Sequence, residues 1–257
     1  MTQRDAQGEP EQVRREASGD GATPPKRRVA VIMAHPDDAE FVCAGTVARW
    51  ADEGHEIVYV IVTNGDKGTH DPSITPEQLA EIRKREQQEA ARILGVKDVI
   101  FLDWPDGMVV PDLTLRRELV RVVRRVRPDI VISGDPTVYW VGTTYINHPD
   151  HRAVAEAALA ALYPAAGNRH YFPELLDEGL EPHKITELYL YSATEADTFI
   201  DITPYIERKL AALRAHASQI GEWNPDEMIR EWAREEGKRA NPPVEYAESF
   251  KRFTPEG

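Results

Sequence analysis

The chain has 257 residues, a hydrophobic fraction of 41% and a formal net charge of −13 at pH 7. This length and apolar content are sufficient for one large domain with a sizeable core. The acidic balance argues against binding to nucleic acid or to an anionic membrane, because both need a basic face. No apolar run approaches the ~20 residues of a membrane span, and no secretory signal is recognisable, so we expect a cytoplasmic protein.

Residues 1–27 are rich in Gln, Glu, Arg, Gly and Pro and nearly lack large apolar side chains. This composition predicts a disordered leader, followed by a single domain over residues 28–257. The only cysteine, Cys43, lies between Val42 and Ala44. It is therefore expected to be a packed thiol, not a nucleophile.

From residue 28 to about residue 165, short apolar strands alternate with amphipathic helices. Continuous apolar runs predict buried strands, and the helices between them are bounded by recognisable signals, such as the Thr75, Pro76 and Gln78 start of a capping box. The predicted strands are 29–33, 56–63, 99–104 and 129–133, and the predicted helices are 39–53, 76–94, 115–127 and 152–162.

This alternation predicts an α/β fold, a Rossmann-like three-layer sandwich with a mostly parallel sheet. Further strands are expected at 187–192 and 198–203, followed by a helix over 204–218. The last forty residues are expected to form a helix and loops packed on the sheet.

Two polar clusters follow predicted strands. His35, Asp37 and Asp38 come directly after the first strand, and His148, Asp150 and His151 follow the fourth strand after a fifteen-residue loop. In an open α/β sheet, ligands bind beyond the carboxyl ends of the strands. Right-handed crossovers place these ends on one edge, so the two clusters are expected to converge.

These residue types suit a catalytic zinc site, which takes three His or carboxylate ligands and leaves one position open. His35, Asp38 and His151 would be the ligands. Asp37 would take the proton of a water whose pKa the zinc lowers toward ~7.

His148 would stabilise the oxyanion or protonate the leaving amine. Asp150 would hold one imidazole in its tautomer. The simpler alternative is that Asp37 or Asp38, and Asp150, only cap the helices that follow them. Capping does not account for the histidines.

The stretches AHPDDAEF and YINHPDHRAV resemble the paired motifs of the LmbE-like, or PIG-L, family of zinc-dependent deacetylases. The likeness covers roughly residues 28–220. It implies the same roles as above for the motif residues. It also implies that Arg83 holds substrate, whereas the alternative for Arg83 is a solvated helix charge. Asp106 is a candidate for binding a substrate hydroxyl.

Some relatives carry a basic residue before the second motif that helps to form the oxyanion pocket. Here that position is Asn147, so either its amide substitutes or another residue takes the role. The 134–147 loop also carries Tyr139, Trp140 and Tyr145, whose rings suit sugar stacking; a packing role for the tryptophan is the alternative.

The expected function is removal of the acetyl group from an N-acetylglucosamine-type sugar or conjugate, a small-molecule substrate. Two alternatives stay open: an amidase acting on a mycothiol- or bacillithiol-type conjugate, and a non-catalytic sugar- or nucleotide-binding protein. A nucleotide-binding module needs a Gly-rich turn where this chain has His-Pro-Asp-Asp. A homo-oligomer is compatible with the sequence.

Overall fold

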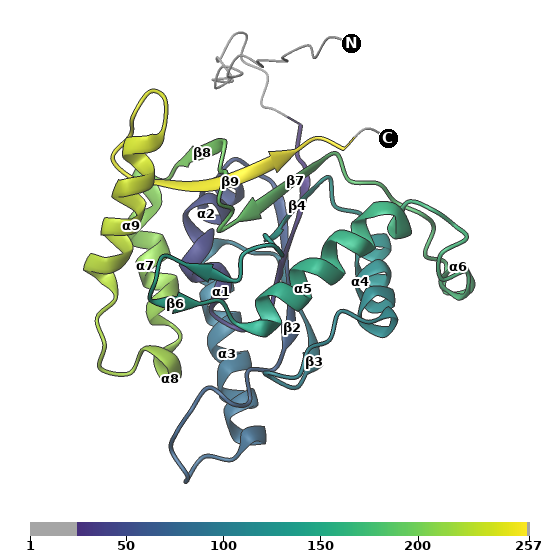
Figure 1. Cartoon of the computed structure of the whole chain (residues 1–257), viewed down its shortest axis with the longest axis horizontal. Coiled ribbons are helices and arrows are strands. Elements are labelled where there is room, and N and C mark those ends of the chain that lie inside the picture. The colour runs from purple at the N-terminus through teal and green to yellow at the C-terminus, as the bar shows by residue number, and fades with distance from the viewer. Residues whose placement is uncertain (1–24, 256–257) are drawn as a thin grey trace, which may run out of the picture.

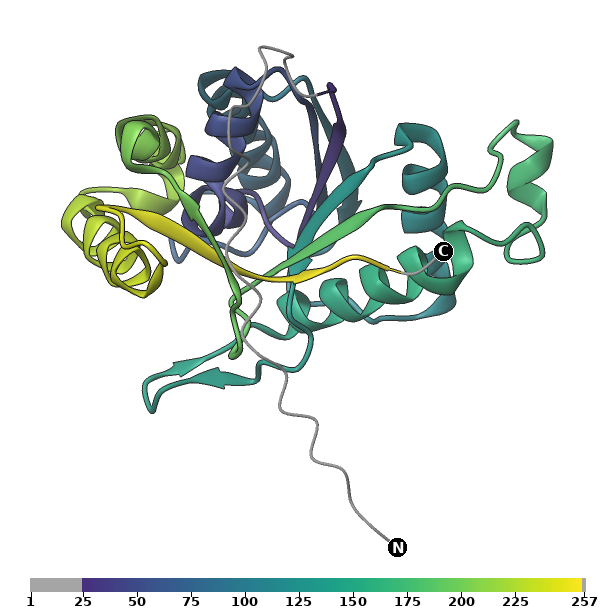
Figure 2. The ribbon, with the colours of Figure 1, turned by 90° about the horizontal axis from the view of Figure 1, so that it is seen from above.

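The computed structural model of the protein describes residues 25–255, so most of the predicted leader lies outside the described residues. Within them, the central sheet has seven strands in the order β3-β2-β1-β4-β7-β9-β8, and helices cover both of its faces (Figures 1 and 2). The strands are β1 (Arg28–Met33), β2 (Glu56–Thr63), β3 (Asp98–Trp104), β4 (Ile130–Gly134), β7 (Glu187–Tyr191), β8 (Thr198–Asp201) and β9 (Ala247–Phe253). The predicted three-layer α/β fold is confirmed.

The first strand shows how the sheet is buried from both sides. Its successive side chains point to opposite faces. Val29, Val31 and Met33 enter one apolar core with α1 (Asp38–Val42), α2 (Ala44–Asp52) and α3 (Pro76–Leu94). Ala30 and Ile32 enter the other core, with α4 (Leu113–Val126), α5 (Pro149–Ala160) and the kinked segment η1 (Ala161–Ala166). Cys43 is buried in the first of these cores, as predicted.

The capping box at the start of α3 forms as predicted: the Thr75 hydroxyl accepts from the Gln78 amide, and the Gln78 side chain accepts from the Thr75 amide. The predicted single helix over 39–53 is wrong, because the backbone leaves the helical region at Cys43 and two helices form. The carboxylate of Glu248 accepts from the amides of Gly45 and Thr46 at 3.0 and 2.7 Å. A distant carboxylate on β9 therefore caps the second helix.

The C-terminal part differs most from prediction. The final forty residues contain α9 (Asp226–Arg239), but also β9, which pairs antiparallel with both β7 and β8. The helix predicted over 204–218 is divided into the 3-10 turn η2 (Thr203–Tyr205), α7 (Ile206–Arg214) and α8 (Ala217–Ile220). The short α6 (Glu174–Asp177) and the hairpin strands β5 (Trp140–Val141) and β6 (Tyr145–Ile146) complete the described elements. None of the helices within residues 25–255 has both the length and the apolar character needed to cross a membrane.

A buried ion pair joins this C-terminal part to the first core. Lys209 on α7 donates to Glu248 at 2.6 Å and to the carbonyl of Phe41 at 2.7 Å, and both charged side chains are buried. Lys209→Met is expected to lower the free energy of unfolding by about 3 kcal/mol, because it leaves a buried carboxylate without its cation. Urea denaturation measures this loss. The control Lys238→Met removes an exposed pair with Glu235 and should cost less than about 1 kcal/mol. Equal losses in the two variants would contradict the prediction.

Candidate active site

The two polar clusters lie beside one another at the carboxyl ends of β1 and β4. These strands are neighbours, and the strand order reverses between them, which is where ligands bind in open α/β sheets. The rings of His35 and His151 are 5.1 Å apart, and those of His35 and His148 are 4.5 Å apart. The fold therefore brings together residues separated by more than a hundred positions, as the sequence predicted.

The three aspartates of the clusters do not cap helices. Asp37 is the residue before α1, but its side chain makes no capping bond. Asp38 accepts from the amide of His35 at 2.8 Å. Asp150 accepts from the amides of Gly107 and Val109 at 2.6 and 3.2 Å. The capping alternative is therefore wrong for all three, and it is His148 that accepts the α5 amide of Asp150.

Side-chain atoms of three residues converge with a spacing that suits a metal site. His35 Nδ1 lies 3.2 Å from His151 Nε2 and 3.5 Å from Asp38 Oδ2, while His151 Nε2 lies 3.1 Å from Asp38 Oδ1. Ligand atoms bound to one tetrahedral zinc are roughly 3.3 Å apart, because zinc–nitrogen and zinc–oxygen bonds are about 2.0–2.1 Å long. The observed separations fit one metal ion held by these three residues.

The outer hydrogen bonds fix which imidazole nitrogens face this point. His35 Nε2 lies 3.1 Å from Asp106 and 3.3 Å from Asp150. Both carboxylates are acceptors, so Nε2 carries the proton and donates to them. His151 Nδ1 lies 2.9 Å from the amide oxygen of Asn147, whose nitrogen donates to the carbonyl of Val138. The remaining nitrogens, Nδ1 of His35 and Nε2 of His151, thus keep their lone pairs for a metal.

The electrostatic environment also favours a cation. Burial lowers the pKa of His35, but hydrogen bonds to Asp106, Asp150 and Asp38 outweigh it and raise the pKa to about 12. Burial likewise lowers the pKa of His151, and the Asp38 carboxylate reverses the shift, so the net change is upward. The cluster therefore stabilises added positive charge, which a proton or a metal ion can supply.

A second set of residues also meets the geometric requirement for a metal: His35, Asp106, His148 and Asp150. This set is less suitable, because its donor atoms are already used in hydrogen bonds. The Asp150 carboxylate accepts from two backbone amides, and His148 Nδ1 accepts from the amide of Asp150. His148 Nε2 is also 4.0 Å from Asp106. The residues predicted as ligands therefore fit a metal better than the alternative set.

Asp37 is held beside the candidate ligands by Arg83. The guanidinium donates to the Asp37 carboxylate at 3.2 Å, to the carbonyl of Pro36 at 2.6 Å and to that of Gly65 at 3.0 Å. A side chain at Gly65 would collide with it, since a Cβ there would lie 2.6 Å from Arg83. Arg83 is only 3% exposed, so the alternative of a solvated helix charge is wrong. Its contact with substrate stays a prediction.

The pKa of Asp37 suits a base at neutral pH. Burial raises this pKa, the Arg83 guanidinium opposes the rise, and the neighbouring Asp38 charge adds to it, with a net value of about 6. The group is thus mostly ionised at pH 7 and close to the ideal range for proton transfer.

His148 presents a proton donor beside His35 and His151. Its Nδ1 accepts the amide of Asp150, so the neutral ring carries its proton on Nε2. Burial lowers the pKa of His148, and the charge of His35 lowers it further, which favours this neutral form. The side chain is partly exposed, as contact with a substrate requires.

Sequence reasoning missed residues that orient the predicted ones. The sequence suggests Asn147 only for an oxyanion pocket, but its two ends bind His151 and the carbonyl of Val138. The sequence suggests Asp106 only for a substrate hydroxyl, but it contacts His35 and lies 3.8 Å from Arg83. The position of Asn147, four residues before His151, is a signal for this contact in the sequence. Substrate contact by Asp106 stays a prediction.

The 134–147 loop, which carries the aromatic side chains, forms a hairpin of β5 and β6 that projects from the sheet (Figure 2). Trp140 pairs with Ile146, and Val141 pairs with Tyr145, so these pairs lie on opposite faces of the hairpin. Burial raises the pKa of the Tyr145 phenol, and the charge of Asp38 raises it further. Trp140 is 69% exposed and does not anchor the loop by packing.

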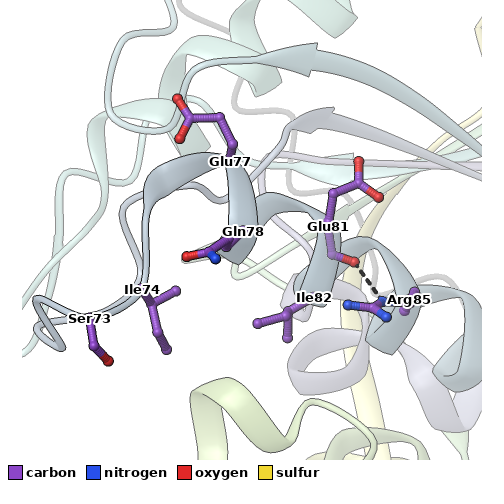
Figure 3. A pocket seen from close by; sticks show the side chains of 7 residues that line it. All are labelled: Ser73, Ile74, Glu77, Gln78, Glu81, Ile82 and Arg85. Atoms are coloured by element: carbon purple, nitrogen blue, oxygen red, sulfur yellow. Dashed lines mark hydrogen bonds between the residues drawn. The ribbon is translucent and has the colours of Figure 1, made fainter.

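A separate hollow lies on α3 and the loop before it (Figure 3). Its volume is about 580 Å³, and its lining includes Ser73, Glu77 and Arg85. The Arg85 side chain donates to the carbonyl of Glu81. None of the predicted site residues lines this hollow.

Comparison with known proteins agrees with this geometry. Residues 30–162 match the family described as PIG-L: GlcNAc-PI de-N-acetylase. The diacetylchitobiose deacetylase of Thermococcus kodakarensis is 35% identical, over 89% of this chain and 84% of its own. The probable N-acetyl-alpha-D-glucosaminyl L-malate deacetylase 2 of Bacillus anthracis is 30% identical, over 76% of this chain and 82% of its own.

A solved structure is also similar in its arrangement. The N,N'-diacetylchitobiose deacetylase of Pyrococcus horikoshii superposes with a TM-score of 0.81 and is 32% identical. The superposition covers 89% of this chain and 84% of that protein. The likeness therefore extends beyond the paired motifs to most of the chain.

Proposed function

The chain belongs to the PIG-L family, also called LmbE-like, and we propose that it is a zinc-dependent hydrolase that removes the acetyl group from an N-acetylglucosamine unit of a small sugar or sugar conjugate. The observation that carries this proposal is the convergence of His35, Asp38 and His151 on one point, with Asp37 and His148 beside it. We take residues 28–257 as one deacetylase domain.

The metal would be held by His35, Asp38 and His151. When bound, it would supply a positive charge that polarises the acetyl carbonyl and acidifies water. Asp150 and Asp106 would hold His35 in its metal-binding tautomer, and Asn147 would do the same for His151.

Asp37 would take a proton from the water that attacks the acetyl carbon. His148 Nε2–H would donate to the carbonyl oxygen as negative charge develops on it. Asp37, now protonated, would return the proton to the departing amine as the carbon–nitrogen bond breaks. The products are acetic acid, which ionises to acetate, and the amino sugar, which takes up the released proton as an ammonium group; Asp37 ends in its initial state.

The direct test is amine release from a panel of compounds. It should contain N-acetylglucosamine, diacetylchitobiose, an N-acetylglucosaminyl malate, an N-acetylglucosaminyl inositol and a thiol conjugate of the mycothiol type. Turnover of at least one acetylated sugar, with one acetate formed per amine, is expected. Cleavage of the thiol conjugate alone would favour the amidase alternative. No turnover, with sugar binding retained, would favour the non-catalytic one.

Tyr145 is expected to contact the sugar, because its ring is half-exposed on the hairpin that leads into His148 and the charge of Asp38 acts on its phenol. Tyr145→Ala should raise KM by up to ~10-fold, the equivalent of one hydrogen bond or ring contact. The matched control is Trp140→Ala, since Trp140 lies on the opposite face, and its KM should be unchanged. If only the tryptophan variant changed KM, the assignment of the two faces would be wrong.

The cytoplasmic location and the homo-oligomer that the sequence suggested stay predictions.

A further inference from the structure

The backbone of Asp37 adopts an unusual conformation that requires support. Its φ is 107° and its ψ is −25°, in the positive-φ region that side-chain-bearing residues rarely occupy. Such a conformation is strained and persists only where its surroundings hold it. Arg83 binds the carboxylate and the preceding carbonyl. The amide of Asp37 has a separate partner.

That partner is the side chain of Gln87 on α3. Its Oε1 accepts from the Asp37 amide at 3.0 Å, and its Nε2 lies 3.2 Å from both carboxylate oxygens of Glu40. A flipped amide would point NH₂ at the Asp37 N–H and its oxygen at the carboxylate, so only one orientation satisfies both ends. Glu40 therefore fixes the way in which Gln87 holds Asp37.

Glu40 is in turn held by His216, at the turn between α7 and α8. His216 Nε2 lies 3.1 Å from the Glu40 carboxylate. Gln87, Glu40 and His216 are each 0% exposed. A buried carboxylate needs such partners to keep one position. The three side chains thus form one continuous hydrogen-bonded chain that ends on the main-chain amide of Asp37.

We propose that Gln87, Glu40 and His216 are positioning residues that hold the Asp37 carboxylate in its reactive orientation. The inference rests on the proposed function, in which Asp37 is the base. His216 lies outside residues 30–162, the part that matches the family. The C-terminal helices of this chain would thereby contribute to a reaction whose groups all come from the first 151 residues.

The test uses variants that each remove one hydrogen bond of the series from His216 through Glu40 and Gln87 to Asp37. Gln87→Met keeps the length of the side chain but cannot accept from Asp37, and its matched control is Gln88→Met at the exposed neighbouring position. His216→Leu removes the donor to Glu40, while His216→Gln retains one. Initial rates with diacetylchitobiose, zinc content and melting temperature are measured for each variant.

Gln87→Met is expected to lower kcat roughly 10–100-fold, since small displacements of a reacting group cost about that much. KM should change less than about twofold, and zinc content should not change. His216→Leu should lower kcat about tenfold, and His216→Gln should recover most of it. The double variant Gln87→Met with His216→Leu should be no slower than Gln87→Met alone, because both act through one link.

The variant Lys209→Met shows what a general loss of stability does to the rate. It breaks the buried ion pair with Glu248 but changes none of Gln87, Glu40 and His216. Assayed below its melting temperature, it should keep the wild-type kcat. The inference is overturned if Gln87→Met retains its kcat, if it loses zinc together with activity, or if His216→Gln is as slow as His216→Leu. Failure of the proposed function itself would appear differently, as an Asp37→Asn variant with an unchanged rate.

Discussion

Asp37→Asn should lower kcat by ~10³-fold while the protein keeps its metal. The substitution preserves the size of the side chain but removes the basic oxygen that accepts the proton of water, and general bases contribute about 10²–10⁴-fold. At pH 7 the group is available as a base, because its pKa is about 6. Steady-state rates of amine release, measured beside the zinc content of the same preparation, check this prediction.

The matched control is Asp71→Asn. Asp71 is an exposed aspartate in the loop before α3, where it accepts from Ser73. Its variant should retain full activity. An Asp37→Asn protein that kept the wild-type rate would show that another group is the base. A variant that lost its metal would instead place Asp37 among the ligands.

Removal of the metal should abolish turnover, with a loss of at least ~10³-fold, because polarisation of the carbonyl by a metal contributes several kcal/mol. Dialysis against a chelator, followed by addition of zinc, should remove and then restore activity. The melting temperature should fall in the metal-free protein, because a ligand that binds only the folded state stabilises it. Activity that is indifferent to the chelator would contradict the proposed metal dependence.

Single variants then decide between the two candidate ligand sets. His151→Ala and Asp38→Ala should each lose zinc, whereas His148→Ala should keep zinc and lose activity. His183→Ala serves as the control, since His183 contacts the carbonyl of Pro128, away from the cluster. The reverse pattern, with zinc lost from His148→Ala and kept by His151→Ala, would assign the metal to His35, Asp106, His148 and Asp150.

Much of the fold was predictable from local patterns. The first four strands and the capping box at Thr75 depend on runs of apolar side chains and on contacts within a few residues. The strand β9 was not predictable in this way. Its sequence AESFKRF carries three charged side chains. Glu248 is buried against Lys209, Lys251 pairs with Asp197 and Arg252 pairs with Glu187. Only pairing with β7 and β8 makes this segment a strand.

The break between α1 and α2 at Cys43 also depends on a contact that is distant in sequence. Nothing in residues 38–52 signals an interruption, and the amides that it exposes are satisfied by Glu248, about two hundred positions later. A buried amide needs a partner, so the break is stable only in the folded protein.

For the site, the sequence by itself determined which groups meet: His35, Asp37 and Asp38 after one strand, His148, Asp150 and His151 after another, joined by the rule that parallel strand ends share an edge. Only the tertiary structure decided how each group is oriented. The nitrogen that His35 or His151 offers depends on Asp106, Asp150 and Asn147, and the backbone of Asp37 depends on Gln87. Orientation is set by hydrogen bonds across the fold, and those partners are distant in sequence, so no local pattern contains them.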